Sequence, residues 1–142
     1  MYTVVLTIVC GIQYKRGMNQ QSTEQFDALF ENLSLELRRG TVILVVLSQL
    51  QEPQYGYSLI EQLANEGIPI EAGTLYPLLR RLESQNLLQS FWETSGAKPR
   101  KYYSLTESGS RMLDLLADQW YATTKSVVRL LKRSAPDDTE PT

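Results

Sequence analysis

The last third of the chain carries a long apolar seam at helical spacing. Successive seam positions lie alternately three and four residues apart, at Leu113, Leu116, Trp120, Thr123, Val127 and Leu130. Met112, Leu115 and Leu131 widen the same stripe. A helix of about 28 residues extends about 42 Å at 1.5 Å per residue, which is longer than a small domain covers. The seam therefore predicts a helix over 107–133 that pairs with a second chain, and packing on the chain's own core is the alternative.

The composition removes most enzyme chemistry. A chain of 142 residues suits one small domain with a helical appendage. It contains no histidine and one cysteine, Cys10, which excludes Ser-His-Asp and Cys-His catalysis, histidine-ligated zinc and an intrachain disulfide. The acidic residues do not cluster at a spacing that suggests acid–base catalysis. We expect a protein that is not an enzyme and that uses no metal and no cofactor.

The two ends of the sequence differ from its middle. Residues 1–17 hold an apolar run that is too short to span a membrane, and Lys15 and Arg16 follow this run, whereas a signal peptide has its charges first. The run fits an extra strand, a helical turn or an unstructured tail. Alternatively, translation starts at Met18, because Lys-Arg-Gly is what a purine-rich ribosome-binding sequence would encode. We treat 1–21 as an N-terminal extension and 134–142 as an acidic tail, and we expect a cytoplasmic protein without a membrane partner.

Between these ends, helical patterns precede a β-hairpin. The expected elements are helices over Ser22–Arg39, Gly56–Glu66 and Gly73–Asn86, strands over Leu87–Thr94 and Lys101–Leu105, and a final helix opened by Thr106. Thr41–Leu50 fits a buried helix by its length, whereas its β-branched residues favour a strand. This order predicts a mainly α fold with a small β-hairpin. The expected fold is a winged helix-turn-helix domain over 22–106, followed by a dimerisation helix over 107–133. This fold makes nucleic acid the leading partner.

The net charge of −2 conceals a segregation of charge along the chain. Five cations and two acids lie within 74–101, which gives this stretch a net charge of +3. Four acids and no base lie within 52–71. A positive field confined to one helix and one loop lets a small acidic protein hold phosphates.

The cations occupy two places that suit DNA. On the helix over 73–86 the leucines form a buried stripe, and the free face and its flanks carry Thr74, Tyr76, Arg80 and Arg81. Such side chains near a helix N-terminus suit phosphates and base edges in a major groove. The loop after it carries Lys98, Arg100 and Lys101, and a hairpin tip of this kind can reach a minor groove or the flanking backbone. A solvated helix and an ordinary charged turn are the alternatives.

Three segments of the chain resemble the PadR family of bacterial transcriptional regulators. They are QYGYSLIEQL at Gln54–Leu63, GTLYPLLRRLESQNLL at Gly73–Leu88, and PRKYYSLTESG at Pro99–Gly109. The resemblance covers about Leu37 to Leu131, and it implies a winged helix-turn-helix on a homodimer that usually acts as a repressor. It also implies that Thr41–Leu50 is a helix. Asn86 stands where relatives often have glycine, and residues 1–17 have no counterpart in the family.

The resemblance also implies roles for single residues. The helix over 73–86 becomes the recognition helix, whose DNA contacts are Thr74, Tyr76, Arg80 and Arg81, and the cations of the wing, 95–101, are Lys98, Arg100 and Lys101. Tyr55 is expected to contact a phosphate, and Tyr57 is expected mainly to pack.

The seam and the first helix are expected to form the dimer interface. Its expected residues are Phe26, Phe30, Leu113, Leu116, Trp120, Val127 and Leu130. Trp120 is either an anchor of this interface or a platform for a small aromatic effector, because some relatives hold flat compounds between paired tryptophans of this helix. The leading function is that of a dimeric DNA-binding repressor on a pseudo-palindromic operator. A winged-helix module that binds a protein and no DNA is the alternative.

Overall fold

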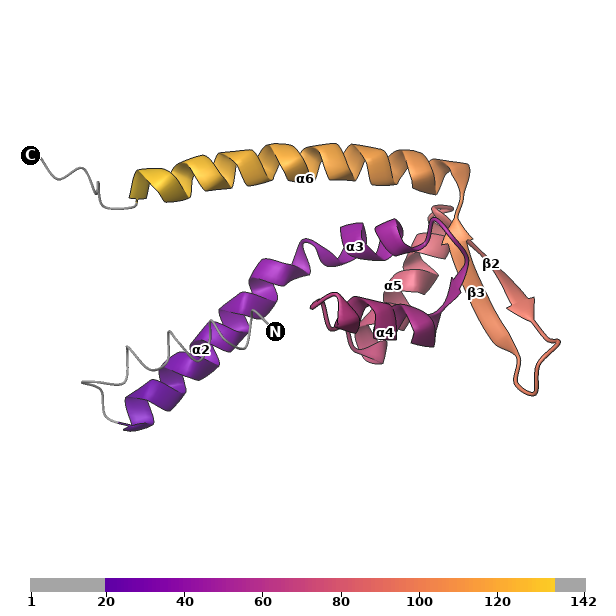
Figure 1. Ribbon diagram of the computed structural model, residues 1–142, viewed down its shortest axis with the longest axis horizontal. Coiled ribbons are helices and arrows are strands. Elements are labelled where there is room, and N and C mark those ends of the chain that lie inside the picture. The colour runs from indigo at the N-terminus through magenta and orange to yellow at the C-terminus, as the bar shows by residue number, and fades with distance from the viewer. Residues whose placement is uncertain (1–19, 135–142) are drawn as a thin grey trace, which may run out of the picture.

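The computed structural model describes residues 20–134, which form five helices and a small sheet. In chain order these elements are α2 (Gln20–Arg39), α3 (Val42–Gln49), β1 (Gln54–Tyr55), α4 (Gly56–Asn65), α5 (Ala72–Ser84), β2 (Leu88–Glu93), β3 (Arg100–Leu105) and α6 (Glu107–Ser134). Figure 1 shows a compact part made of α3, α4, α5 and the β2–β3 hairpin, from which α2 and α6 extend on the side away from the hairpin. The questions about Met18 and the acidic tail lie outside the described residues, apart from Ser134 at the end of α6.

The structure confirms the predicted class, which is mainly helical with a small antiparallel sheet. The stretch with conflicting signals, Thr41–Leu50, is a helix, because Val46, Leu47 and Leu50 all point into the core from one helical face. The strand β1 was not predicted from the sequence; it has two residues, pairs with β3 and gives the sheet the order β1-β3-β2. Pairing of Gln54 with Tyr103 and of Tyr55 with Tyr102 anchors the N-terminus of α4 to the hairpin.

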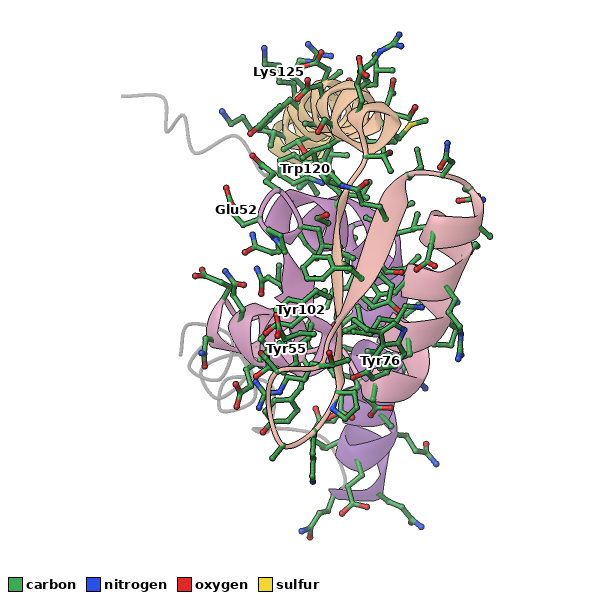
Figure 2. All side chains as sticks on the ribbon, turned by 90° about the vertical axis from the view of Figure 1, so that its right-hand side faces the viewer. Glu52, Tyr55, Tyr76, Tyr102, Trp120 and Lys125 are labelled. Carbon is green, nitrogen blue, oxygen red and sulfur yellow. The ribbon has the colours of Figure 1, made fainter. Side chains whose placement is uncertain are left out.

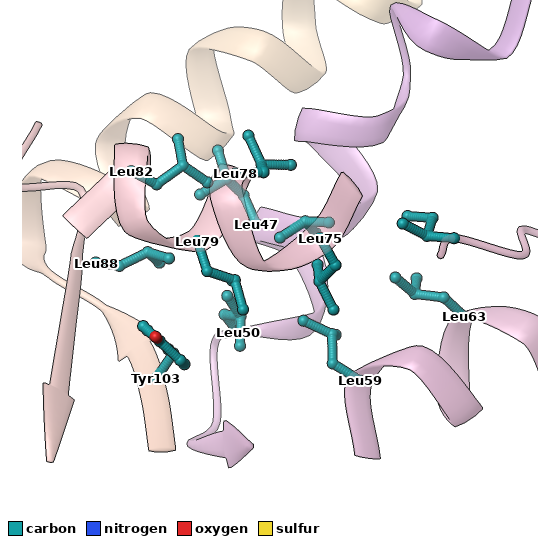
Figure 3. Close-up of a cluster of buried hydrophobic side chains, with 12 residues drawn as sticks. Leu47, Leu50, Leu59, Leu63, Leu75, Leu78, Leu79, Leu82, Leu88 and Tyr103 are labelled. Carbon is teal, nitrogen blue, oxygen red and sulfur yellow. The ribbon is translucent and has the colours of Figure 1, made fainter. Parts of the chain in front are cut away.

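The core is a leucine cluster between α3, α4, α5 and the sheet (Figure 3). α5 contributes its predicted stripe, namely Leu75, Leu78, Leu79 and Leu82. Leu47 and Leu50 enter from α3, Leu59 and Leu63 from α4, and Leu88 and Tyr103 from the strands. Since one face of α5 is buried along its length, the opposite face is held toward solvent in a fixed orientation.

Two left-handed residues end the helices of the helix-turn-helix unit. Gly67 follows α4 at φ 79°, and Asn86 follows α5 at φ 64°. In both turns the next amide reaches back to the helix: Ile68 N–H donates to Leu63 O at 2.8 Å, and Leu87 N–H donates to Leu82 O at 3.0 Å. Asn86 therefore adopts the left-handed conformation at the end of α5, as the tolerance of asparagine for this conformation predicts.

Thr106 joins the end of α5 to the start of α6. Its hydroxyl donates to Asn86 O at 2.7 Å and accepts from Gly109 N–H at 3.0 Å, which caps the helix as predicted. Its own N–H donates to Leu87 O at 3.0 Å. The backbones approach so closely here that a Cβ on Gly109 would lie 2.0 Å from Leu87 O. This contact fixes the direction in which α6 leaves the sheet.

Candidate nucleic-acid interface

The free face of α5 presents the predicted DNA contacts to solvent. Thr74, Tyr76, Arg80 and Arg81 are all exposed, and they lie opposite the leucine stripe. The ring of Tyr76 packs against the first residue of α4, since a Cβ on Gly56 would lie 2.5 Å from this ring. α5 begins at Ala72, so Pro77 lies past the first turn, one position further into the helix than the sequence suggests. The helix continues through Pro77 to Ser84.

The three wing cations differ in their surroundings. Lys98 lies in the exposed turn between β2 and β3. The guanidinium of Arg100 lies over the ring of Tyr55, 4.7 Å from its centroid. Lys101 points to the opposite face of β3, where its Nζ lies 3.6 Å from Glu83 Oε2 on α5 and 5.2 Å from the centroid of the Tyr103 ring. Lys101 therefore connects the wing to α5, and its charge is offset by Glu83.

A row of aromatic rings crosses all three strands on the outer face of the sheet. Phe91 on β2 stacks on Tyr102 at 5.4 Å and 9°, and Tyr102 meets Tyr55 on β1 edge-on at 5.5 Å. The row ends at Arg100, which covers Tyr55. The Tyr55 ring is half-buried in these contacts, and it holds the guanidinium of Arg100 near the wing.

Tyr57 does not pack, and this prediction is wrong. Its side chain is 59% exposed on α4, where its hydroxyl bonds the carboxylate of Glu61 one turn later. The negative charge of Glu61 and this hydrogen bond raise the pKa of Tyr57 above its ordinary value. The sequence contains two tyrosines around a glycine, and the pairing of β1 with β3 decides which of them lies over the sheet.

The turn of the wing is closed by a local hydrogen-bonded pair. Glu93 accepts hydrogen bonds from the hydroxyl of Ser95 and, at 3.2 Å, from Ser95 N–H. These bonds hold the pKa of the Glu93 carboxyl below its usual range. Glu93 therefore shapes the turn in its charged form, beside a tip that carries Lys98.

A hollow of about 380 Å³ separates α5 from the wing. It is lined by Tyr55, Gly56, Tyr76, Arg80, Trp92, Pro99, Arg100, Lys101 and Tyr103. Figure 2 shows Tyr55, Tyr76 and Tyr102 near the hairpin, and Trp120 on α6 at the other end of the view. The hollow brings together residues of α5 and of the hairpin that lie about twenty positions apart in the sequence. Trp92 was missed in the sequence, because it lies just before the loop and carries no charge.

The expected dimer residues divide into two groups. Leu113 and Leu116 pack against the chain's own core, in the half of α6 that contacts α3. Trp120, Val127 and Leu130 lie farther along α6 and are exposed, and no residue of α2 is buried, with Phe26 and Phe30 both exposed. The first part of the seam therefore packs within the chain, while Trp120 and Val127 farther along present apolar surface to solvent. Trp120 is 41% exposed and meets Tyr121 edge-on at 5.5 Å.

Metal-binding clusters and membrane-spanning helices are both absent from the described part of the chain. Residues 20–134 hold no group of three or more histidine, cysteine, aspartate or glutamate side chains arranged to bind a metal ion. No helix among the same residues combines the length and apolar character needed to cross a membrane.

Together, the three-helix core, the antiparallel hairpin and the cationic face that they share define a winged helix-turn-helix protein. The sequence profile of the transcriptional regulator PadR-like family matches residues 43–115. The chain belongs to this family of transcriptional regulators.

Solved structures of family members have the same fold. A PadR family transcriptional regulator from Eggerthella lenta DSM 2243 is 50% identical, and the match covers 82% of this chain and 99% of that one with a TM-score of 0.73. A PadR-like transcriptional regulator from Bacillus cereus is 28% identical over 68% of this chain and 96% of its own, with a TM-score of 0.62. A transcriptional regulator of Mycobacterium tuberculosis is 33% identical over 55% of this chain and 74% of its own length.

Proposed function

We propose that this regulator is a homodimeric repressor that binds a pseudo-palindromic DNA operator. α5 enters the major groove, and the wing, 95–101, contacts the adjacent backbone or minor groove. The observation that carries the proposal is the convergence of Arg80 from α5 with Arg100 and Lys101 from the hairpin on one hollow, since none of the described residues that line it is acidic.

The dimer part of the proposal rests on the apolar surfaces of α2 and α6. Both helices extend from the compact part on the same side, and both expose large apolar side chains. α2 is 20 residues long, exposes Leu29, Leu33 and Leu37, and buries none of its residues. Because helices in proteins draw most of their stability from the packing of an amphipathic face, the exposed apolar face of α2 calls for a covering surface. A second copy of the chain supplies such a surface from its own α6 and places two recognition helices on one duplex.

The first test is binding to the protein's own promoter. A gel shift should give a discrete complex, footprinting should locate two half-sites, and light scattering should give the mass of a dimer. A monomer at micromolar concentration contradicts the dimer. The absence of a shift with both its own and neighbouring promoters contradicts operator binding and leaves the module that binds a protein instead.

The second test separates the wing from the dimer. Arg100→Ala should weaken operator binding about tenfold or more, because a hydrogen bond to a charged group is removed from each half-site. It should also lower the salt dependence of binding, while the dimer remains intact. Lys125→Ala is the matched control, because it removes an exposed cation from α6, far from the hollow. Equal binding by the Arg100→Ala variant and the wild type contradicts the assignment.

We also propose Trp120 as the contact for a small aromatic effector. Its ring is partly exposed on the part of α6 that lies beyond the contacts with the core. Titration with planar cationic or phenolic compounds should quench tryptophan fluorescence in a saturable manner. The Trp120→Ala variant should lose this quenching, and quenching that persists in the variant contradicts the proposal.

A further inference from the structure

The hollow between α5 and the wing has a composition that suits one kind of occupant. Its lining combines cations from two elements with the rings of Tyr76 and Trp92, and its volume of about 380 Å³ is within the range of small-ligand sites. Trp92 is 62% exposed, which is unusual for a large aromatic side chain with a second ring close by. An occupant that is anionic on one side and apolar on the other would satisfy both groups of side chains.

The geometry of a winged helix on DNA brings such an occupant to this place. When α5 lies in a major groove and the wing reaches the adjacent minor groove, the strand that separates the two grooves runs between them. This strand presents a phosphate and the apolar face of a deoxyribose at each step. We propose that the hollow holds one sugar–phosphate unit of this strand, with Arg80 and Arg100 on the phosphate and Trp92 packed on the deoxyribose. The inference rests on the proposed operator binding and names the part of the DNA that this hollow recognises.

The surroundings of the three cations assign them different roles. Within residues 20–134 Arg80 has no ion pair, and Arg100 is held by the Tyr55 ring rather than by a carboxylate, so both guanidinium groups are available to a phosphate. Lys101 is paired with Glu83 at 3.6 Å, and this pair connects the two walls of the hollow. Lys101 is therefore a positioning residue, and Arg80 and Arg100 are the contacts.

Trp92 is placed for a contact with the sugar by the register of the sheet. It lies opposite Lys101 on β3, so it shares the face of the sheet that is turned toward α5, while its neighbour Phe91 lies on the other face and stacks on Tyr102. The two adjacent aromatic residues thus have separate roles. Phe91 supports the sheet, and Trp92 extends the apolar part of the hollow.

The decisive experiment neutralises the DNA instead of the protein. Operator duplexes that carry one methylphosphonate linkage at a time are titrated with the wild-type dimer. One linkage in each half-site, between the major groove read by α5 and the adjacent minor groove, should lower the affinity about tenfold or more. Arg80→Ala should lower the affinity by a similar factor on the unmodified operator, and this variant should lose part of its sensitivity to methylphosphonate at that same linkage. The double variant Arg80→Ala/Arg100→Ala should be insensitive to methylphosphonate there. In the double variant the slope of log affinity against log salt should fall by about 0.9 for each phosphate that is no longer neutralised, or about 1.8 for the dimer.

Substitutions at Trp92 test the apolar half of the site. Trp92→Ala should weaken operator binding severalfold with an unchanged salt slope, and Trp92→Phe should retain most of the affinity. In a Trp120→Phe background, Trp92 is the only tryptophan of the chain, so its fluorescence should become shielded from acrylamide when operator is added. Circular dichroism and the mass of each variant establish that it is folded and dimeric.

The outcomes separate this inference from the proposed function. If the wild-type protein binds no operator, the proposed function fails. If it binds with two half-sites, but Trp92→Ala binds as the wild type does or no linkage couples to Arg80, the hollow does not hold the backbone and only this inference fails. The inference would also be overturned if a free mononucleotide shielded Trp92 from acrylamide but did not compete with operator for the protein. The occupant of the hollow would then be a small ligand.

Discussion

The close approach of α6 to the turn after α5 makes a quantitative prediction for Gly109. In Gly109→Ala the new Cβ would lie 2.0 Å from Leu87 O and 3.0 Å from Leu87 C, both backbone atoms that cannot rotate away. Forcing an extra methyl into such a contact costs about 1–3 kcal/mol. The displaced backbone also weakens the hydrogen bond from Thr106 N–H to Leu87 O, a bond worth about 0.5–1.5 kcal/mol. Replacing glycine by alanine also stabilises the helix itself by about 0.5–1 kcal/mol, because glycine is the poorer helix former.

The net expectation for Gly109→Ala is a loss of about 2 kcal/mol in the free energy of unfolding. For a domain of this size that corresponds to a fall in Tm of about 8 °C. The measurement is urea and thermal unfolding followed by circular dichroism, with both proteins at the same concentration because association of the proposed dimer would add to the stability.

Gly73→Ala provides the matched control for this prediction. A Cβ at Gly73 meets no described atom within 4 Å, so the same substitution there should leave α5 unchanged or stabilise it by about 0.5–1 kcal/mol. The contact between α6 and Leu87 would be refuted if the free energy of unfolding of Gly109→Ala lay within about 0.5 kcal/mol of the wild-type value. Equal changes in the free energy of unfolding at the two glycines would refute it as well.

Three further substitutions test other parts of the structure. Leu79→Ala should cost about 2–5 kcal/mol in urea unfolding, because this side chain is completely buried in the core, and a smaller loss would mean that the core collapses around the cavity. Thr106→Val should cost about 1 kcal/mol by removing the cap of α6, and hydrogen exchange should then increase in the first turn of that helix, whereas unchanged exchange would exclude the cap. Gly56→Ala should alter stability little but weaken operator binding about tenfold, because its methyl displaces the flexible end of Tyr76; added to Tyr76→Ala it should cause no further loss, and an additive loss would contradict this coupling.

Periodicity in the sequence was sufficient to predict most of the fold. The leucine stripe of α5 and the seam of α6 each lie on one helical face, and Thr106 and Asn86 carry local signals whose geometry is confined to a few neighbouring residues. Local propensity alone left Thr41–Leu50 ambiguous, because burial of one helical face by the rest of the chain decides against its β-branched residues. β1 has only two residues, and its existence depends on a partner strand that comes some 45 positions later.

The site was predictable in its residue types and less so in their roles. The charge count identified Arg80, Arg100 and Lys101, and the structure brings all three to one hollow. It could not show that Lys101 faces Glu83 while Arg100 faces Tyr55, because alternate residues of a strand point to opposite faces and the register is set by tertiary pairing. The charge count passed over Trp92 because this residue is uncharged, and only the pairing of β2 with β3 shows that it lies on the same face of the sheet as Lys101.

The buried core of the protein is confined to the middle of the chain. Every buried apolar residue among 20–134 lies between Val46 and Tyr103, whereas the exposed apolar residues of α2 and of the far half of α6 lie outside these limits. Selection can therefore change the two sets of residues independently. In the proposed dimer, after a gene duplication, substitutions on α2 and α6 would stop two paralogues from exchanging subunits and would leave the proposed DNA contacts of each unchanged. If α5 reads the operator as proposed, substitutions on its free face would redirect one paralogue to new genes without a change in its choice of partner.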